Sequence, residues 1–278
     1  MRFDNILVVD WSGGNDRGPT PKKDAIWSAL IETGTAQPSR YFRNRAAVEA
    51  YLLALFTEKC DAGQTLLAGF DFPFGYAGGF AEKITGSSDP LKLWDYYAEN
   101  LIDTPKRNNR FALANSLNQH FPGTGPFWFN ASRKDLADLP HKGRDCHGHG
   151  LPEKRLCESL AKGAFSCWQL GGAGAVGSQA ITGMASLSRL RSSLPGQISV
   201  WPFEPLTTPI ALVEVWPSLH AAQVRAAMQD GDIKDEVQVR ITAANIAAVQ
   251  TQGTLCAALA AVPKSARDAE GWILGLQP

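Results

Sequence analysis

The spacing of apolar residues divides the first third of the chain into short runs and one longer amphipathic stretch. Residues 6–9 and 65–70 form continuous apolar runs, which are typical of strands buried on both faces. Residues 25–31 and 40–42 predict two further strands. Between residues 45 and 59, apolar side chains recur at helical spacing opposite a charged face, which predicts a helix. This order of elements predicts an α/β fold.

The pattern changes between residues 76 and 167, where glycine, proline, aromatic and charged residues are mixed. Helical spacing recurs there only over 91–101 and 110–120. We therefore expect one domain over residues 1–278, in which residues 76–167 are a large insertion after the fourth strand.

Beyond the insertion, a glycine-rich segment at 171–177 leads into a predicted helix at 178–194. The later patterns predict strands at 198–203 and 210–216, followed by helices at 219–228, 241–261 and 266–274.

Composition narrows the functional classes. Of the 278 residues, 44% are hydrophobic, and 27 Lys and Arg balance 27 Asp and Glu. A chain of this length and hydrophobicity can bury a large core, which excludes an intrinsically disordered protein. It also lacks the strongly basic balance of an unselective nucleic-acid binder, although a local basic surface is compatible with zero net charge.

Three features of the sequence bear on cellular location. The five cysteines are odd in number and irregularly spaced, which favours free thiols over a disulfide framework. The first residues lack the basic start and the cleavage site of a signal peptide. There is also no run of about 18 apolar residues, the length that a membrane span needs. We expect a cytoplasmic protein that does not bind a membrane.

Four acidic residues stand out by their positions. Asp10 and Asp71 directly follow predicted core strands, Glu214 lies inside an apolar strand, and Asp268 begins the last predicted helix. A buried carboxylate is unfavourable unless it is paired or binds a cation. Clustered carboxylates that bind a divalent cation can support phosphoryl transfer. The alternative is that each Asp only forms a turn or caps a helix.

The segments around these acids resemble a known family. Residues 8–12, 69–75 and 213–217, together with Asp268 and Ala269, are similar to the predicted ribonuclease-H-like nuclease family, which is defined as a domain of unknown function. In that family an Asp ends the first strand, Asp-x-Pro ends the fourth, Glu-x-x-Pro ends the fifth, and a last helix carries an Asp. The resemblance implies a ribonuclease-H-like mixed β-sheet flanked by helices, and it leaves the insertion unmatched.

Carried onto this chain, the resemblance implies that Asp10, Asp71 and Asp268 bind Mg²⁺ or Mn²⁺ and that Glu214 is a fourth ligand. The same four acids are the expected catalytic residues. Glu270 competes with Asp268, because both lie near one end of the last predicted helix.

Substrate contacts are predicted for four residues outside the acidic set. Ser12 follows the first aspartate, and His147 and His149 lie on a glycine-flanked loop. Arg144, like Arg133, belongs to a stretch of the insertion in which basic and aromatic residues alternate. Because basic groups contact phosphates and aromatic rings stack on unpaired bases, this stretch is a candidate nucleic-acid surface. A small satellite core with a solvated face is the alternative.

Two other patterns have weaker specificity. The glycine-rich segment at 171–177 lacks the Gly-Lys-Ser/Thr ending of a P-loop, but phosphate could bind there at the start of the following helix. Imidazoles and thiols that could bind zinc cluster in the insertion, at spacings that match no usual zinc finger: His141, Cys146, His147, His149 and Cys157.

The leading hypothesis is therefore a metal-dependent nuclease or phosphodiesterase that acts on nucleic acid or nucleotides. The same fold also carries nucleotide-binding phosphotransferases and ATPases, which are the first alternative. A non-catalytic binding protein that retains the fold is the second.

Overall fold

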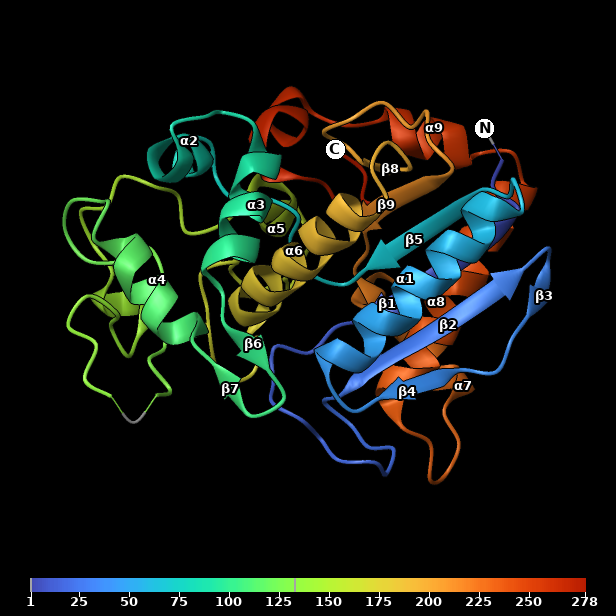
Figure 1. Ribbon diagram of the computed structural model, residues 1–278, viewed down its shortest axis with the longest axis horizontal. Helices are drawn as coiled ribbons and strands as arrows, with labels where there is room; N and C mark the ends of the chain where they lie inside the picture. The colour runs from blue at the N-terminus through green and yellow to red at the C-terminus, as the bar shows by residue number, and fades with distance from the viewer. Residues whose placement is uncertain (1, 133) are drawn as a thin grey trace.

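In the computed structural model, which describes residues 2–132 and 134–278, the central element is a mixed seven-stranded sheet (Figure 1). Its strand order is β3–β2–β1–β5–β9–β8, with β4 also paired to β2. Strands β1, β5, β9 and β8 run parallel, and β2 runs antiparallel to β1, β3 and β4. The bounds are β1 (Asn5–Asp10), β2 (Ile26–Glu32), β3 (Thr35–Ala36), β4 (Arg40–Phe42), β5 (Leu66–Phe70), β8 (Ile198–Val200) and β9 (Ile210–Glu214).

Helices cover both faces of this sheet. In Figure 1, α1 (Arg45–Asp61) lies in front of the sheet and α8 (Lys234–Thr251) behind it. The hydrophobic cluster on the α1 side also includes α6 (Val176–Ser193) and the alternate β1 residues Leu7 and Val9. The other β1 residues, Ile6 and Val8, pack in a second cluster with α8. The continuous apolar run of β1 thus reflects burial on both faces, as predicted.

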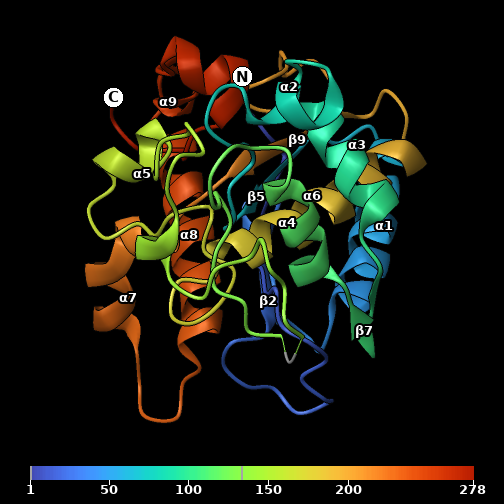
Figure 2. The ribbon, with the colours of Figure 1, turned by 90° about the vertical axis from the view of Figure 1, so that its left-hand side faces the viewer.

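The insertion is built onto the main core. It contains helix α3, which packs along α6, and Phe80, Trp94 and Tyr97 join the hydrophobic cluster of α1 and β1. Figure 2 looks onto this part of the molecule, with its loops in front of the sheet. Its elements are α2 (Phe80–Thr85), α3 (Pro90–Asn100), β6 (Asp103–Thr104), β7 (Arg107–Asn108), α4 (Arg110–Asn118), η1 (Gly143–Asp145) and α5 (Leu156–Leu160).

The C-terminal region departs from the sequence prediction in two places. The helix expected at 241–261 begins earlier, at Lys234, and is broken after α8 by Gly253, whose φ of 76° ends the helix. The helix expected at 266–274 is wrong: after the single turn η3 (Ala266–Glu270), the chain extends and Ile273 pairs beside Glu214. Trp272 is fully buried in the α8 cluster, which fixes this extended conformation. The remaining helices are η2 (Pro217–His220), α7 (Ala221–Ala227) and α9 (Leu255–Ala260).

The α/β class and the mixed sheet flanked by helices are therefore confirmed. No helix within the described residues combines the length and apolar character that a membrane crossing requires.

Candidate functional site

Asp10 and Asp71 lie side by side at the carboxyl-terminal edge of the sheet. Strands β1 and β5 are parallel neighbours in which Val9 pairs with Phe70, so the next residue of each strand is one of the two aspartates. The two carboxyl groups share a hydrogen bond. Asp71 also accepts a hydrogen bond of 2.6 Å from the backbone N–H of Trp11. This edge is where ligands bind in open α/β sheets.

The environment of the pair favours a shared proton. Burial, and then the charge of Asp71, raise the pKa of Asp10 well above its ordinary value. Burial also raises the pKa of Asp71, to about 7, against the opposing effect of the hydrogen bonds from Asp10 and Trp11. Among the described residues, neither carboxylate forms an ion pair. The pair is thus a partly buried acidic site without an ion-pair partner among the described residues.

A third aspartate approaches the pair from α8. The charge of Asp235, in the first turn of this helix, raises the pKa of both Asp10 and Asp71. Its carboxylate accepts a hydrogen bond of 2.7 Å from the backbone N–H of Asp24, and burial raises its own pKa. Asp235 lies outside the helix that the sequence predicts, which begins at 241. The acidic pair formed by Asp235 and Glu236 is a first-turn signal that could have located it.

These acids belong to a cavity of about 660 Å³. Asp10, Asp24 and Asp235 line it, and Asp71 adjoins it through the hydrogen bond to Asp10. The remaining wall comes from the loop that follows β1, the glycine-rich segment 171–175, the start of α6, and the side chains of Arg17 and Arg110. Acidic and basic groups therefore face one cavity.

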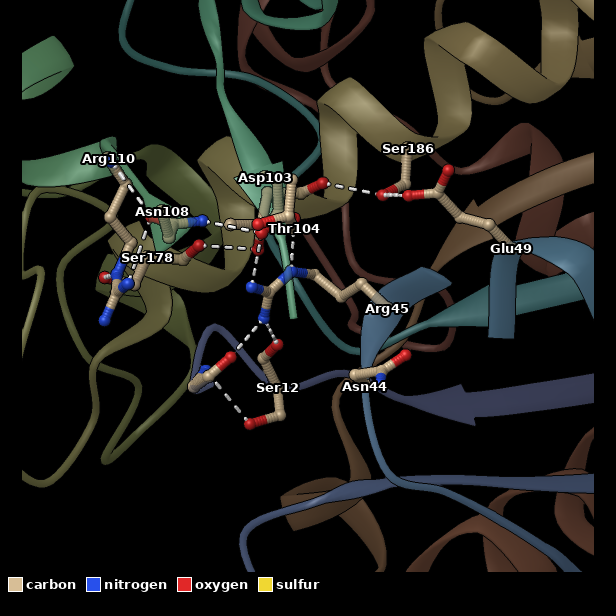
Figure 3. Close-up of polar contacts among 12 residues, drawn as sticks. Ser12, Asn44, Arg45, Glu49, Asp103, Thr104, Asn108, Arg110, Ser178 and Ser186 are labelled. Atoms are coloured by element: carbon tan, nitrogen blue, oxygen red, sulfur yellow. Dashed lines mark hydrogen bonds and ion pairs between the residues drawn. The ribbon is translucent and has the colours of Figure 1, made fainter. Parts of the chain in front are cut away.

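The loop after Asp10 is held from both sides. As Figure 3 shows, the Arg45 guanidinium lies between the Asp103 carboxylate and the loop. It donates to the carbonyl groups of Ser12, at 2.8 Å, and Gly14. On the other side of the loop, a Cβ on Gly13 would lie only 2.7 Å from the Cβ of Ser178 in α6. Because Asp103 lies in the insertion, the buried ion pair ties the insertion to the cavity wall.

Glu214 is separate from this acidic cluster. Glu214 pairs with Phe70 in the sheet, so these two side chains lie on the same face. Asp71 follows Phe70 directly, so its side chain leaves the opposite face from that of Glu214. Arg155 binds the Glu214 carboxylate at 2.7 and 2.9 Å, and the Phe74 N–H donates to it at 3.0 Å. Arg155 also pairs with Glu158, and all three charged side chains are buried. Glu214 is thus part of an ion network that joins the insertion to β9.

Asp268 and Glu270 are also distant from the cavity. Asp268 is exposed on the η3 turn, pairs with Lys264, and lines a different cavity beside Trp201. The Glu270 carboxylate accepts a hydrogen bond of 2.6 Å from the N–H of Leu156. Neither Asp268 nor Glu270 lines the cavity that contains Asp10. The acid that a late helix does bring there is Asp235.

Only one of the four predicted substrate contacts lines the cavity. Ser12 does so, with its hydroxyl donating to the Asp24 carbonyl at 3.1 Å. Arg144, His147 and His149 lie on a loop outside the cavity wall. The imidazoles there bind backbone groups, at 2.9 Å for His147 and 3.2 Å for His149. Arg133, from the same basic stretch, lies outside the described residues.

The donor chemistry of the acidic site fits a hard divalent cation. Within the described part of the chain, no group of three or more His, Cys, Asp or Glu side chains is placed to hold a metal by itself. The candidate zinc ligands of the insertion therefore do not form such a group among the described residues. Mg²⁺, however, is usually bound through one or two carboxylates, with water and substrate phosphate completing its ligands. Asp10 and Asp71 supply two partly buried carboxyl groups that form no ion pair within the described residues, and Asp235 adds negative charge beside them.

Comparisons of the chain with models of protein families, with curated proteins and with solved structures find no match. Its function must therefore be derived from the geometry of this site.

Proposed function

We propose that the protein is a metal-dependent phosphodiesterase or nuclease with a ribonuclease-H-like core. The observation that carries the proposal is the partly buried, hydrogen-bonded pair of Asp10 and Asp71, which lacks an ion-pair partner among the described residues. The order of the acids also supports it: one ends β1, one follows the parallel strand β5, and Asp235 lies on a late helix.

Each residue of the site has a separate task in this mechanism. A divalent cation bound there would activate water for attack on phosphorus and stabilise charge on the phosphate oxygens. Asp10 and Asp71 would hold the cation and give up the proton that they share. The Trp11 N–H fixes the orientation of the Asp71 carboxylate. Asp235 adds a third negative charge on the α8 side.

The size of the cavity indicates which substrates reach the acids. Small-molecule sites have volumes of about 300–1,000 Å³, and the 660 Å³ measured here falls in that range. A single nucleotide unit, free or at an unpaired position of a strand, matches this volume better than an intact duplex.

The test compares the acids of the cavity with Asp268, which the sequence predicts as a ligand but which lies outside the cavity. Cleavage of single-stranded, duplex and hybrid substrates is measured with Mg²⁺ and with Mn²⁺. Asp10→Asn, Asp71→Asn and Asp235→Asn should each reduce cleavage by at least about 100-fold, because a metal-stabilised charge is worth several kcal/mol. Asp268→Asn is the matched control and should cleave at the wild-type rate. Absence of wild-type activity, or full activity in the Asp10 and Asp71 variants, would refute the proposal.

A nucleotide-dependent phosphotransferase or ATPase is the second candidate. It is favoured by the glycine-rich segment in the cavity wall, where Gly172 and Gly174 adopt positive φ angles of 75° and 78°. Such a segment can wrap closely around a phosphate chain. Thermal stabilisation by Mg²⁺-nucleotide, with none by oligonucleotides, would support this candidate over a nuclease.

A further inference from the structure

Arg110 contributes a positive charge to the cavity without an acidic partner. Among the described residues it forms no ion pair, and the neighbouring carboxylate, Asp103, is bound to Arg45. The hydrogen-bond partners of Arg110 are neutral: the Ser178 hydroxyl lies 2.9 Å from Nε, and the Asn108 side-chain oxygen lies 3.1 Å from Nη1. Burial lowers the pKa of Arg110 only to about 10, so it stays charged at neutral pH.

The geometry of the guanidinium leaves one donor group unused. Within the described residues, Nη2 of Arg110 makes no hydrogen bond, whereas Nε and Nη1 are fixed by their neutral partners. Figure 3 shows the guanidinium beside Ser178 and Asn108, with one nitrogen turned away from both. The ring of Phe111, 4.5 Å from the guanidinium carbon, supports its orientation. The side chain is therefore held in place with a donor available to a ligand.

The glycine-rich segment offers a second and independent set of donors. Its backbone N–H groups at residues 172–175 make no hydrogen bond within the described structure, although the N–H groups of Val176 to Gln179 do. Residues 172–175 all line the same cavity as Arg110. Successive N–H groups in a segment with alternating left-handed residues form a concavity that binds anions. Gly172 and Gly174 provide those left-handed positions.

We propose that Arg110 and the backbone N–H groups of residues 172–175 form an anion subsite that binds a phosphate group of the substrate. The subsite lies in the cavity that also contains Asp10 and Asp235, so a phosphate ester could contact both charged regions at once. This inference rests on the proposed function only in that the substrate carries phosphate.

The direct test is binding of inorganic pyrophosphate to the full chain in EDTA, measured by calorimetry. Without a metal, the carboxylates repel the probe, and the attraction comes from the anion subsite and from Arg17 in the same cavity wall, so the Arg110 variant isolates the contribution of the subsite. We expect the wild type to bind and Arg110→Gln to bind about 10- to 100-fold more weakly, which is the effect of losing a charge-assisted hydrogen bond. The control is Arg189→Gln, which removes an arginine that pairs with Glu49 outside the cavity wall and should leave affinity unchanged.

A second variant tests the backbone donors. Ala175 has a φ of −69°, which proline adopts without strain, so Ala175→Pro removes one N–H and leaves the local chain path in place. We expect it to weaken binding several-fold, with a wild-type circular dichroism spectrum. No binding by the wild type, or wild-type affinity in folded Arg110→Gln, would overturn the subsite.

The origin of the phosphate is resolved by repeating the titrations with a nucleoside diphosphate and with an oligonucleotide that lacks terminal phosphates. Loss of affinity in Arg110→Gln for the first ligand alone assigns the subsite to a terminal phosphate, and loss for the second alone assigns it to an internal diester. Affinities unchanged for both ligands count against the subsite. These titrations contain no metal, so a negative cleavage assay does not affect the evidence for the anion subsite. In the same way, absence of pyrophosphate binding refutes the subsite and does not refute metal-dependent cleavage.

Discussion

Replacement of Asp71 by asparagine is expected to stabilise the protein while removing its metal-dependent activity. The wild-type carboxyl group is partly buried beside Asp10 and has no ion-pair partner within the described residues. Burial is the largest influence on its pKa and raises it to about 7, from an ordinary value of 3.8. Asparagine keeps an oxygen that can accept the 2.6 Å hydrogen bond from the Trp11 N–H, and it carries no charge.

The size of the gain follows from the pKa. A folded-state pKa above the unfolded value means that the folded protein binds more protons between the two values, so its stability falls as pH rises through that interval. At about 1.36 kcal/mol per pKa unit, the span from 3.8 to about 7 corresponds to at most about 4 kcal/mol above neutral pH. Asp10 shares the proton and the cavity admits some solvent, so we expect a gain of about 1–3 kcal/mol.

Urea unfolding in EDTA measures this gain at two pH values. At a pH of about 8, Asp71→Asn should have the larger free energy of unfolding. At a pH of about 4 the difference should be much smaller, because the carboxyl group is then protonated in the folded state and about half protonated in the unfolded state. Asp268→Asn is the control, since Asp268 is exposed, and it should change stability by no more than about 0.5 kcal/mol at either pH. Equal or lower stability of Asp71→Asn at the higher pH would show that the carboxylate already has a compensating partner.

Three further outcomes are expected. Mg²⁺ should raise the melting temperature of the wild type but not of Asp10→Asn, because a ligand that binds only the folded state stabilises it; an equal rise in both would contradict the assigned ligands. Arg155→Met should lower the free energy of unfolding by about 3–5 kcal/mol, because it leaves Glu214 buried without its partner; a change within error in urea unfolding would argue against the network. Gly13→Ala should cost about 1–3 kcal/mol and reduce cleavage, because the new methyl group would meet Ser178 at 2.7 Å; wild-type stability and rate would show that the loop adapts freely.

The sequence was sufficient to locate the two acids that end parallel strands. Continuous apolar runs mark buried strands, and the residue that follows each run can be read directly, so Asp10 and Asp71 were found. The place of Glu214 depended on the register between β5 and β9, which the sequence does not display. A register one residue further along would have placed it beside Asp71, and the actual register turns it to the other face.

Other parts of the site required three-dimensional information. The first two turns of α8 lack a clear apolar stripe, so the predicted helix began too late to include Asp235. Arg155 is one of many basic residues of the insertion, and nothing in the sequence distinguishes it from the others, because its burial depends on Glu214, 59 positions away in the chain. The unused N–H groups of residues 172–175 are a property of backbone geometry, and glycine content alone does not reveal them.

The charged side chains of the cavity differ from the buried charged side chains elsewhere in that they lack ion-pair partners among the described residues. Elsewhere in the described structure, the fully buried charged side chains have ion-pair partners, as in the pairs Arg45–Asp103 and Arg155–Glu214. In the cavity, the acids beside Asp10 and the guanidinium of Arg110 face one volume, and within the described residues neither forms an ion pair. Unpaired charges of this kind weaken folding, so the stability of the protein does not explain them. A cation at the acids and a phosphate at Arg110 would neutralise both regions together, and a metal-bound phosphate ester is a single ligand that carries both.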